Sequence, residues 1–199
     1  MRDYGLSAFD VRHRFSFSGS YELPFGNGKR FLKDAGRIVN QAVSGWQLNI
    51  INNLRSGFPF TPALGFNWSR DGNTSAPDRV SFAAGRTLHG IYLHKPEQWV
   101  DARAFVLPPA GTYGNAGRNI LIGPGLANVD VSIFKTTRLS EGRNLQLRAE
   151  IFNILNHANF GIPSPIMLTN TGATAAAAGV ITSTAGTSRQ IQLGAKLNF

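Results

Sequence analysis

Residues 128–151, NVDVSIFKTTRLSEGRNLQLRAEI, contain two runs in which apolar and polar side chains alternate. The apolar positions are Val129, Val131 and Ile133 in the first run and Leu145, Leu147, Ala149 and Ile151 in the second. Successive side chains of a strand point to opposite faces, so each run predicts a strand with one apolar and one polar face. The Ser-Glu-Gly-Arg turn at residues 140–143 joins the runs, and together they predict a hairpin.

Three further runs, at residues 14–23, 46–55 and 190–199, have the same alternation. In the second of them Ile51 and Asn52 interrupt the pattern, which predicts a bulge or a strand end at that point. The sequence as a whole predicts an all-β fold, an antiparallel meander of about five amphipathic strands.

The connections between the runs alternate between short and long. Residues 24–44 and 139–143 make the shorter ones, and residues 57–125 and 155–188 make the long ones. Connections longer than about 12 residues are uncommon in compact domains unless they are functional. The aromatic-rich loop at 57–125 therefore suits either ligand contact or a packed loop core. The stretch at 171–179, rich in Thr, Ala and Gly, is expected to be flexible and solvated.

Composition excludes several classes of protein. Charged residues make up only 16% of the 199 positions, which argues against a helical bundle or coiled coil. The absence of cysteine excludes disulfide scaffolds, thiol nucleophiles and cysteine-ligated metal centres. No stretch approaches the roughly 18 consecutive apolar residues of a membrane helix.

Strand length and loop asymmetry favour a membrane barrel over a soluble sandwich. Membrane strands need about 9 to 11 residues, whereas soluble strands are most often about 5 to 6 residues long. Outer-membrane barrels also have short turns on the periplasmic side and long loops outside. If the last strand ends on the periplasmic side at Phe199, Lys135 lies near the periplasmic headgroups, which its side chain can reach by snorkelling.

Five stretches carry a family resemblance: DVRHRFSFSGSYELPFGNGKRF (10–31), GWQLNIINNLRSGFPFTP (45–62), GNAGRNILIGPGLANVDVSIFK (114–135), RAEIFNILNHANFG (148–161) and QIQLGAKLNF (190–199). In this order and spacing they resemble the C-terminal end of TonB-dependent outer-membrane receptors, in particular the Oar-like group with a carboxypeptidase-regulatory-like domain. Members are 22-stranded barrels, closed by an N-terminal plug, that import bulky ligands with energy from the inner membrane.

The resemblance implies that residues 1–199 correspond to the last five strands of such a receptor in a bacterial outer membrane. The signal peptide, energy-coupling box, plug and earlier strands are expected to lie outside this sequence, with Met1 a truncated or mis-called start. The alternative is a genuine short barrel subunit that oligomerises. Expected partners are outer-membrane lipid, the barrel assembly machinery, the missing barrel and plug and, only through that missing part, the TonB complex. Because five strands cannot close a barrel, this chain alone is not expected to transport.

Three sets of residues are candidates for function. Ile191, Leu193, Leu197 and Phe199 resemble the terminal signal that barrels present to their assembly machinery, although a simple edge strand has the same pattern. Asp130, Arg148, Glu150 and Lys196 are candidate lumen-facing charges, with a solvated sheet face as the alternative. Trp46, Phe58, Phe60 and Phe160 are candidate membrane-interface aromatics, with ordinary core as the alternative.

No catalytic, cofactor or metal site is predicted. The four histidines lack metal-ligand spacing, and no nucleophile motif is present, so the chain is not expected to be an enzyme. The net charge of +9 is spread along the chain, and basic loops beside anionic headgroups explain it without nucleic acid. The alternative function is a soluble, basic all-β module that binds carbohydrate or nucleic acid.

Overall fold

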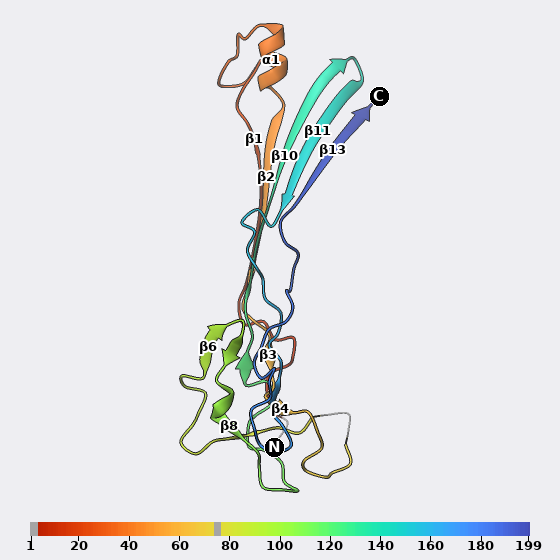
Figure 1. Ribbon diagram of the computed structural model, residues 1–199. Helices are drawn as coiled ribbons and strands as arrows, with labels where there is room; N and C mark the ends of the chain where they lie inside the picture. The colour runs from red at the N-terminus through yellow and green to blue at the C-terminus, as the bar shows by residue number, and fades with distance from the viewer. Residues whose placement is uncertain (1–3, 74–76) are drawn as a thin grey trace. The chain divides into compact units, whose positions relative to one another are not determined.

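The computed structural model describes residues 4–73 and 77–199, so Met1 lies outside the described residues (Figure 1). The chain divides into two compact units. Unit 1 takes in the described parts of Met1–His13, Arg55–Leu126 and Asn159–Gly186. Unit 2 takes in Arg14–Leu54, Ala127–Ala158 and Thr187–Phe199.

Unit 2 is built on an antiparallel sheet of five strands, which confirms the predicted all-β fold. The strands lie in chain order, so the sheet is a meander as predicted. Their order and bounds are β1 Arg14–Glu22, β2 Trp46–Arg55, β10 Leu126–Ser140, β11 Arg143–Phe152 and β13 Gln190–Asn198. β2 continues through Ile51 and Asn52, so the strand does not end there.

The predicted hairpin is confirmed by the pairing of β10 with β11. Ser140 pairs with Arg143 across a two-residue turn, in which Gly142 adopts a left-handed backbone (φ 74°). β10 has 15 residues and is longer than the alternating run at 128–135, because residues up to Ser140 continue to pair with β11.

The register separates the sheet into an apolar and a polar face. On the apolar face, Val131 pairs with Ile151, and Ile151 pairs in turn with Ile191. The next row on that face joins Ile133, Ala149 and Leu193. The polar face includes the row Ser132, Glu150 and Gln192. Between β1 and β2, hydrogen bonds from Ser16 Oγ to Asn53 Oδ1 (3.0 Å) and from Gln47 Nε2 to Ser20 Oγ (2.7 Å) continue the polar interactions.

The connection from β1 to β2 contains the helix α1, Arg37–Val43. Gly45 ends this connection with φ 72°, and its backbone lies directly against β10: Thr136 N–H donates to Gly45 O at 2.8 Å. A Cβ on Gly45 would lie 2.1 Å from Thr136 O, so only glycine allows this approach. The junction therefore fixes the end of α1 at the ends of the neighbouring strands β2 and β10.

Unit 1 consists of short elements that pair across the long connections. Among its described residues, four two-stranded sheets form: β3 with β9, β5 with β8 and β6 with β7 are antiparallel, and β4 with β12 is parallel. The elements are β3 Pro59–Phe60, β4 Ala63–Leu64, β5 Ser81–Phe82, β6 Tyr92–Lys95, β7 Gln98–Val100, the 3-10 helix Ala102–Ala104, β8 Phe105–Val106, β9 Leu121–Ile122 and β12 Ile166–Leu168.

The buried hydrophobic core among the described residues lies in unit 1. Its largest fully buried apolar side chains are Leu64, Ile91, Leu121, Met167, Val80 and Val100. Residues from both long connections thus meet in one core. Of the two alternatives for the loop at 57–125, ligand contact or a packed loop core, much of the loop therefore forms packed core. The expectation of a solvated stretch at 171–179 holds for most of its residues, which are exposed, and is wrong at its end, where Ala178 is buried and the Trp99 backbone N–H donates to Gly179 O at 2.8 Å.

Candidate functional site

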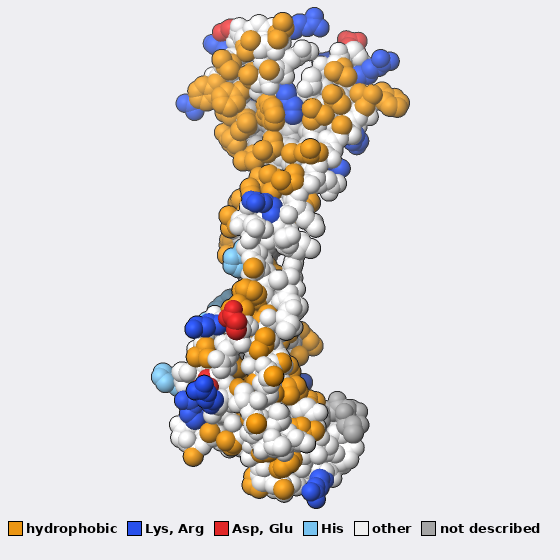
Figure 2. All heavy atoms as spheres, viewed as in Figure 1, with side chains coloured by type: hydrophobic (Ala, Val, Ile, Leu, Met, Phe, Trp, Pro, Cys, Tyr) orange, Lys and Arg blue, Asp and Glu red, His pale blue; other side chains and the backbone are white. Residues whose placement is uncertain are grey.

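The apolar face of the sheet in unit 2 is exposed, and the described core contains none of its residues. Figure 2 shows hydrophobic side chains gathered over the sheet strands. The exposed apolar side chains on β1, β10, β11 and β13 include Phe15, Phe17, Tyr21, Ile133, Leu147, Ile191, Leu193 and Leu197. A face this apolar without a covering layer is unfavourable in water, and its natural counterpart is the hydrocarbon of a bilayer.

The terminal strand β13 presents the candidate assembly signal at an edge of the sheet. β13 pairs with β11 and has no second neighbour among the described strands. Leu193 is 77% exposed and Phe199 is 94% exposed, and Ile191 and Leu197 are exposed as well. All four side chains are therefore accessible, and their role as an assembly signal stays a prediction.

The structure brings two of the four candidate lumen charges into contact. Arg148 Nε lies 3.9 Å from Glu150 Oε2 on the same strand. Arg148 pairs with Gly194 across the sheet, and the Arg148 side chain occupies the space above it, since a Cβ on Gly194 would lie 2.7 Å from Arg148 Nε. Lys196 pairs with Gln146, two positions along β11 from Arg148. The register places these residues on the polar face, and their lumenal role stays a prediction.

Asp130, the fourth charge, has a different set of partners. Its Oδ1 accepts hydrogen bonds from Asn153 N–H and from Asn128 Nδ2, each at 2.8 Å. Asn153 is only 3% exposed and has a left-handed backbone (φ 48°). Its side chain binds His157 N–H, His157 O and Thr187 O at 3.0 Å. Asp130 thus holds the corner where the chain leaves β11.

This corner gives a structural reason for part of the motif FNILNHANFG at residues 152–161. Asn153 was not singled out by sequence reasoning, although the motif that contains it was. Asn156 also has a left-handed backbone (φ 49°), and its Oδ1 accepts from Arg189 N–H at 3.1 Å, next to the start of β13. The two asparagines therefore connect the end of β11 to the start of the terminal strand.

The candidate interface aromatics have different surroundings. Trp46 is half-buried, and its Nε1–H donates to Ala42 O at 2.8 Å. Phe60 is 5% exposed and lies in the core of unit 1. It is therefore an ordinary core residue, which was the alternative to a membrane-interface aromatic. Phe58 is half-buried under the Arg55 guanidinium, 4.1 Å from its ring centre, and Phe160 is half-buried beside a bridge to Thr184.

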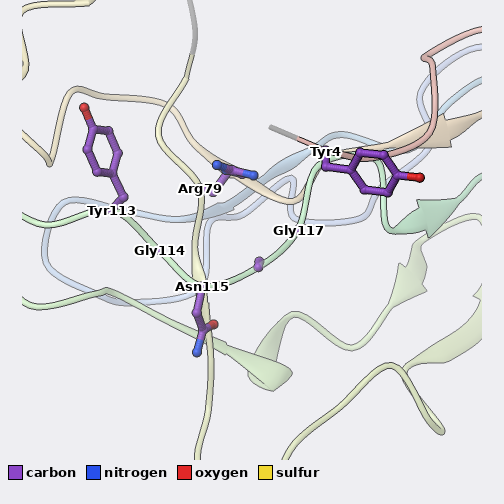
Figure 3. A pocket seen from close by; sticks show the side chains of 7 residues that line it. Tyr4, Arg79, Tyr113, Gly114, Asn115 and Gly117 are labelled. Carbon is purple, nitrogen blue, oxygen red and sulfur yellow. The ribbon is translucent and has the colours of Figure 1, made fainter. Parts of the chain in front are cut away.

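Unit 1 contains a pocket of about 330 Å³ (Figure 3). The residues that line it are Tyr4, Arg79, Tyr113, Gly114, Asn115, Ala116 and Gly117. In Figure 3, Arg79 lies between the two tyrosines. Gly114 lies so close to the backbone at Arg79 and Val80 that a Cβ would be 2.1 Å from Arg79 O. The pocket thus combines a guanidinium, phenol groups and exposed backbone, which suits a polar ligand group.

One hydrogen-bonded pair at the pocket alters two pKa values. Tyr113 OH donates to Asp71 Oδ2 at 2.9 Å, and Asn73 N–H donates to Asp71 Oδ1 at 2.8 Å. The bond from Asn73, followed by that from Tyr113, lowers the pKa of Asp71 below its ordinary value of 3.8. The bond to Asp71 raises the pKa of Tyr113 above its ordinary value of 10.0.

Within residues 4–73 and 77–199, no group of three or more His, Cys, Asp or Glu side chains lies close enough together to hold a metal ion. The same residues include no helix long and apolar enough to cross a membrane.

An amphipathic antiparallel sheet with an uncovered apolar face and a polar opposite face is the pattern of β-barrel membrane proteins. Comparison with protein families agrees, since the family model of the outer membrane beta barrel domain matches residues 1–192. The chain therefore belongs to this family and is located in the bacterial outer membrane. Neither the curated proteins nor the solved structures include a match to it.

Proposed function

We propose that this chain is the C-terminal part of a TonB-dependent receptor, which imports a large ligand with energy supplied from the inner membrane. The observation that carries the proposal is the contrast between the connections. Two long connections fold into unit 1, with a core and a pocket, whereas a two-residue turn joins β10 to β11. Long folded loops outside and short turns inside are typical of outer-membrane barrels. The five stretches that resemble these receptors support the same assignment.

The chain by itself is not transport-competent under this proposal. Within the described residues, β1 and β13 each have one neighbouring strand, so each leaves a row of backbone groups without a sheet partner. In hydrocarbon each unsatisfied group costs several kcal/mol. The remaining barrel strands and the plug would satisfy these edges, the barrel assembly machinery would join them, and the TonB complex would act through the plug segment.

The pocket of unit 1 is the proposed point of ligand contact. Arg79 and Tyr113 come from separate parts of the loop at 57–125, and unit 1 holds them around one space. A guanidinium binds carboxylate or phosphate groups, and a phenol stacks on flat or apolar ligand surfaces. The pocket is too small for a bulky ligand, so it would bind one group of it.

Translation of the DNA immediately upstream of the Met1 codon is the first test. The proposal predicts that the frame continues through further amphipathic strands, a plug and a signal peptide. Deletion of the energy-coupling box in that complete gene should abolish accumulation of ligand while leaving surface binding intact. An in-frame stop followed by an independent translation start would contradict the proposal.

A second test distinguishes the membrane protein from a soluble binding module. We expect the expressed chain to partition into detergent and to aggregate in plain buffer, because the apolar face of its sheet is exposed. A monodisperse monomer in plain buffer with a cooperative thermal transition would favour the soluble, basic all-β module instead.

A further inference from the structure

The connection between β1 and β2 combines positive charge with exposed apolar side chains. Residues 23–45 contain four cations and a single acidic residue, Asp34. The cations are Lys29, Arg30, Lys33 and Arg37. Lys29 pairs with Glu22 at 2.9 Å, in a position where both side chains are largely exposed. The segment therefore presents a net positive surface to its surroundings.

Apolar side chains in the same segment are exposed. Ile38 on α1 is 83% exposed, and Val39 next to it is 50% exposed. Leu32 is 53% exposed and has a left-handed backbone (φ 56°), a conformation that is uncommon for leucine. No residue of α1 is buried. The helix thus forms without burying an apolar stripe within unit 2.

The position of the segment follows from Lys135. Lys135 pairs with Leu147 in the row next to Ile133 and Ala149, so it belongs to the apolar face of the sheet. Its Nζ donates to Gln41 O at 2.7 Å and to Ser44 O, both at the C-terminal end of α1. The same ammonium lies 5.7 Å from the centre of the Trp46 ring. These contacts attach α1 to the apolar face, at the end of the strands that carries the β10–β11 turn (Figure 1).

We propose that residues 24–44 form an interfacial anchor that binds the headgroups of anionic phospholipids. A helix attached to the rim of a lipid-facing surface lies at the level of the headgroups. Exposed apolar residues beside cations are the pattern of segments that lie in that layer, with the apolar side chains inserted and the cations at the phosphates. The charge of the segment is complementary to an anionic lipid and gives no preference for a zwitterionic one.

The proposal rests on the outer-membrane location and is independent of ligand import. It names the cations of one segment that make the contact with anionic headgroups expected from the net charge. Each cation near an anionic membrane surface strengthens binding about fivefold. Salt weakens such contacts, so the lipid preference of the segment should decrease as ionic strength rises.

Native mass spectrometry of the full chain in detergent micelles tests the anchor. The micelles contain equal amounts of phosphatidylglycerol and phosphatidylcholine. We expect retained phosphatidylglycerol to exceed phosphatidylcholine tenfold or more, since three cations at about fivefold each multiply to at most about 100-fold. The triple variant Arg30→Gln, Lys33→Gln, Arg37→Gln should reduce that ratio to near one.

Two further variants separate the anchor from general charge and from misfolding. Arg70→Gln, Lys95→Gln, Arg103→Gln removes three exposed charges from unit 1 and should keep the lipid preference. Arg30→Lys, Arg37→Lys keeps the charge and should also keep it. Circular dichroism of each variant verifies the β-sheet.

Three outcomes would overturn the proposal: equal retention of the two lipids by the unaltered chain, a preference that survives in the triple Gln variant, or an equal loss in the unit 1 control. Retention of a periplasmic protein that requires the same cations, without a lipid preference, would assign the segment to a protein partner instead. None of these outcomes depends on energy-coupled uptake, so the result is distinguishable from a failure of the import proposal.

Discussion

Lys135 shows how one cation is accommodated on the apolar face of the sheet. The sequence predicted a side chain that extends to nearby headgroups. In the structure Lys135 is only 9% exposed, and its ammonium binds two backbone carbonyls at the end of α1. Helix C-termini leave carbonyl groups without intrahelical partners, so a cation there satisfies groups that the helix itself does not.

Replacing Lys135 with Met should destabilise the junction between α1 and the sheet. The variant leaves Gln41 O and Ser44 O without their charged donor, and hydrogen bonds to charged groups contribute about 2 kcal/mol. We expect the free energy of unfolding in detergent, measured with urea, to decrease by about that amount. Lys135→Arg retains a charged donor and should lose less; an equal loss in both variants would argue against the role of the charge.

The pair of Asp71 and Tyr113 predicts a pH dependence in unit 1. Because the folded-state pKa of Asp71 is below 3.8, ionised Asp71 stabilises unit 1 above that pH, and this contribution is lost as the pH falls through the lowered pKa. Tyr113→Phe removes one of the hydrogen bonds and should move the pKa of Asp71 back toward its ordinary value. NMR titration of the Asp71 carboxyl measures the shift, and an unchanged pKa would contradict the contact.

At the scale of the element, the turns decide how the strands are arranged. The two-residue turn at Glu141 and Gly142 closes the hairpin, and a one-residue shift of the pairing between Arg138 and Ser140 then sets the register that aligns the apolar rows of β10 and β11. The longer connection from β1 to β2 is fixed instead by backbone contact between Gly45 and Thr136. A shift of one residue in either pairing would place polar side chains on the lipid-facing side.

Gly45→Ala should disrupt the junction, because a Cβ would lie 2.1 Å from Thr136 O and the residue has φ 72°. We expect a loss of about 2 kcal/mol or more in the free energy of unfolding. Gly36→Ala is the matched control, since a Cβ at that position would have no atom within 4 Å and the residue has φ −57°. Its effect should stay within about 0.5 kcal/mol, and comparable losses in both variants would contradict steric conflict as the cause.

At the scale of the whole molecule, the two units differ in how their apolar side chains are covered. Unit 1 has a core that excludes water, whereas unit 2 has an apolar face that remains uncovered. A core stabilises unit 1 in water, and lipid is the environment that stabilises the sheet of unit 2. One chain thus contains parts suited to both environments.

Leu64→Ala should weaken unit 1 while leaving the sheet of unit 2 intact. Leu64 is fully buried in the core of unit 1, and truncation of a buried leucine costs about 2 to 5 kcal/mol. Fluorescence of Trp68 and Trp99, which pack against this core, should report an earlier transition. Leu88→Ala, at an exposed position, is the control. A simultaneous loss of the β-sheet signal would contradict separate units.

The sequence by itself determined the five strands of the sheet in unit 2, because a period of two with one apolar parity is a local property of each strand. It also determined the hairpin, whose turn chemistry lies within residues 140–143. Unit 1 and the pairing of Asp130 with Asn153 were decided only by the tertiary structure. Their contacts join residues far apart in the chain, such as Leu64 and Met167 in one core, and no local pattern encodes such pairings. The same physical reason explains Phe60, whose aromatic ring fits an interface and a core equally well until its neighbours are known.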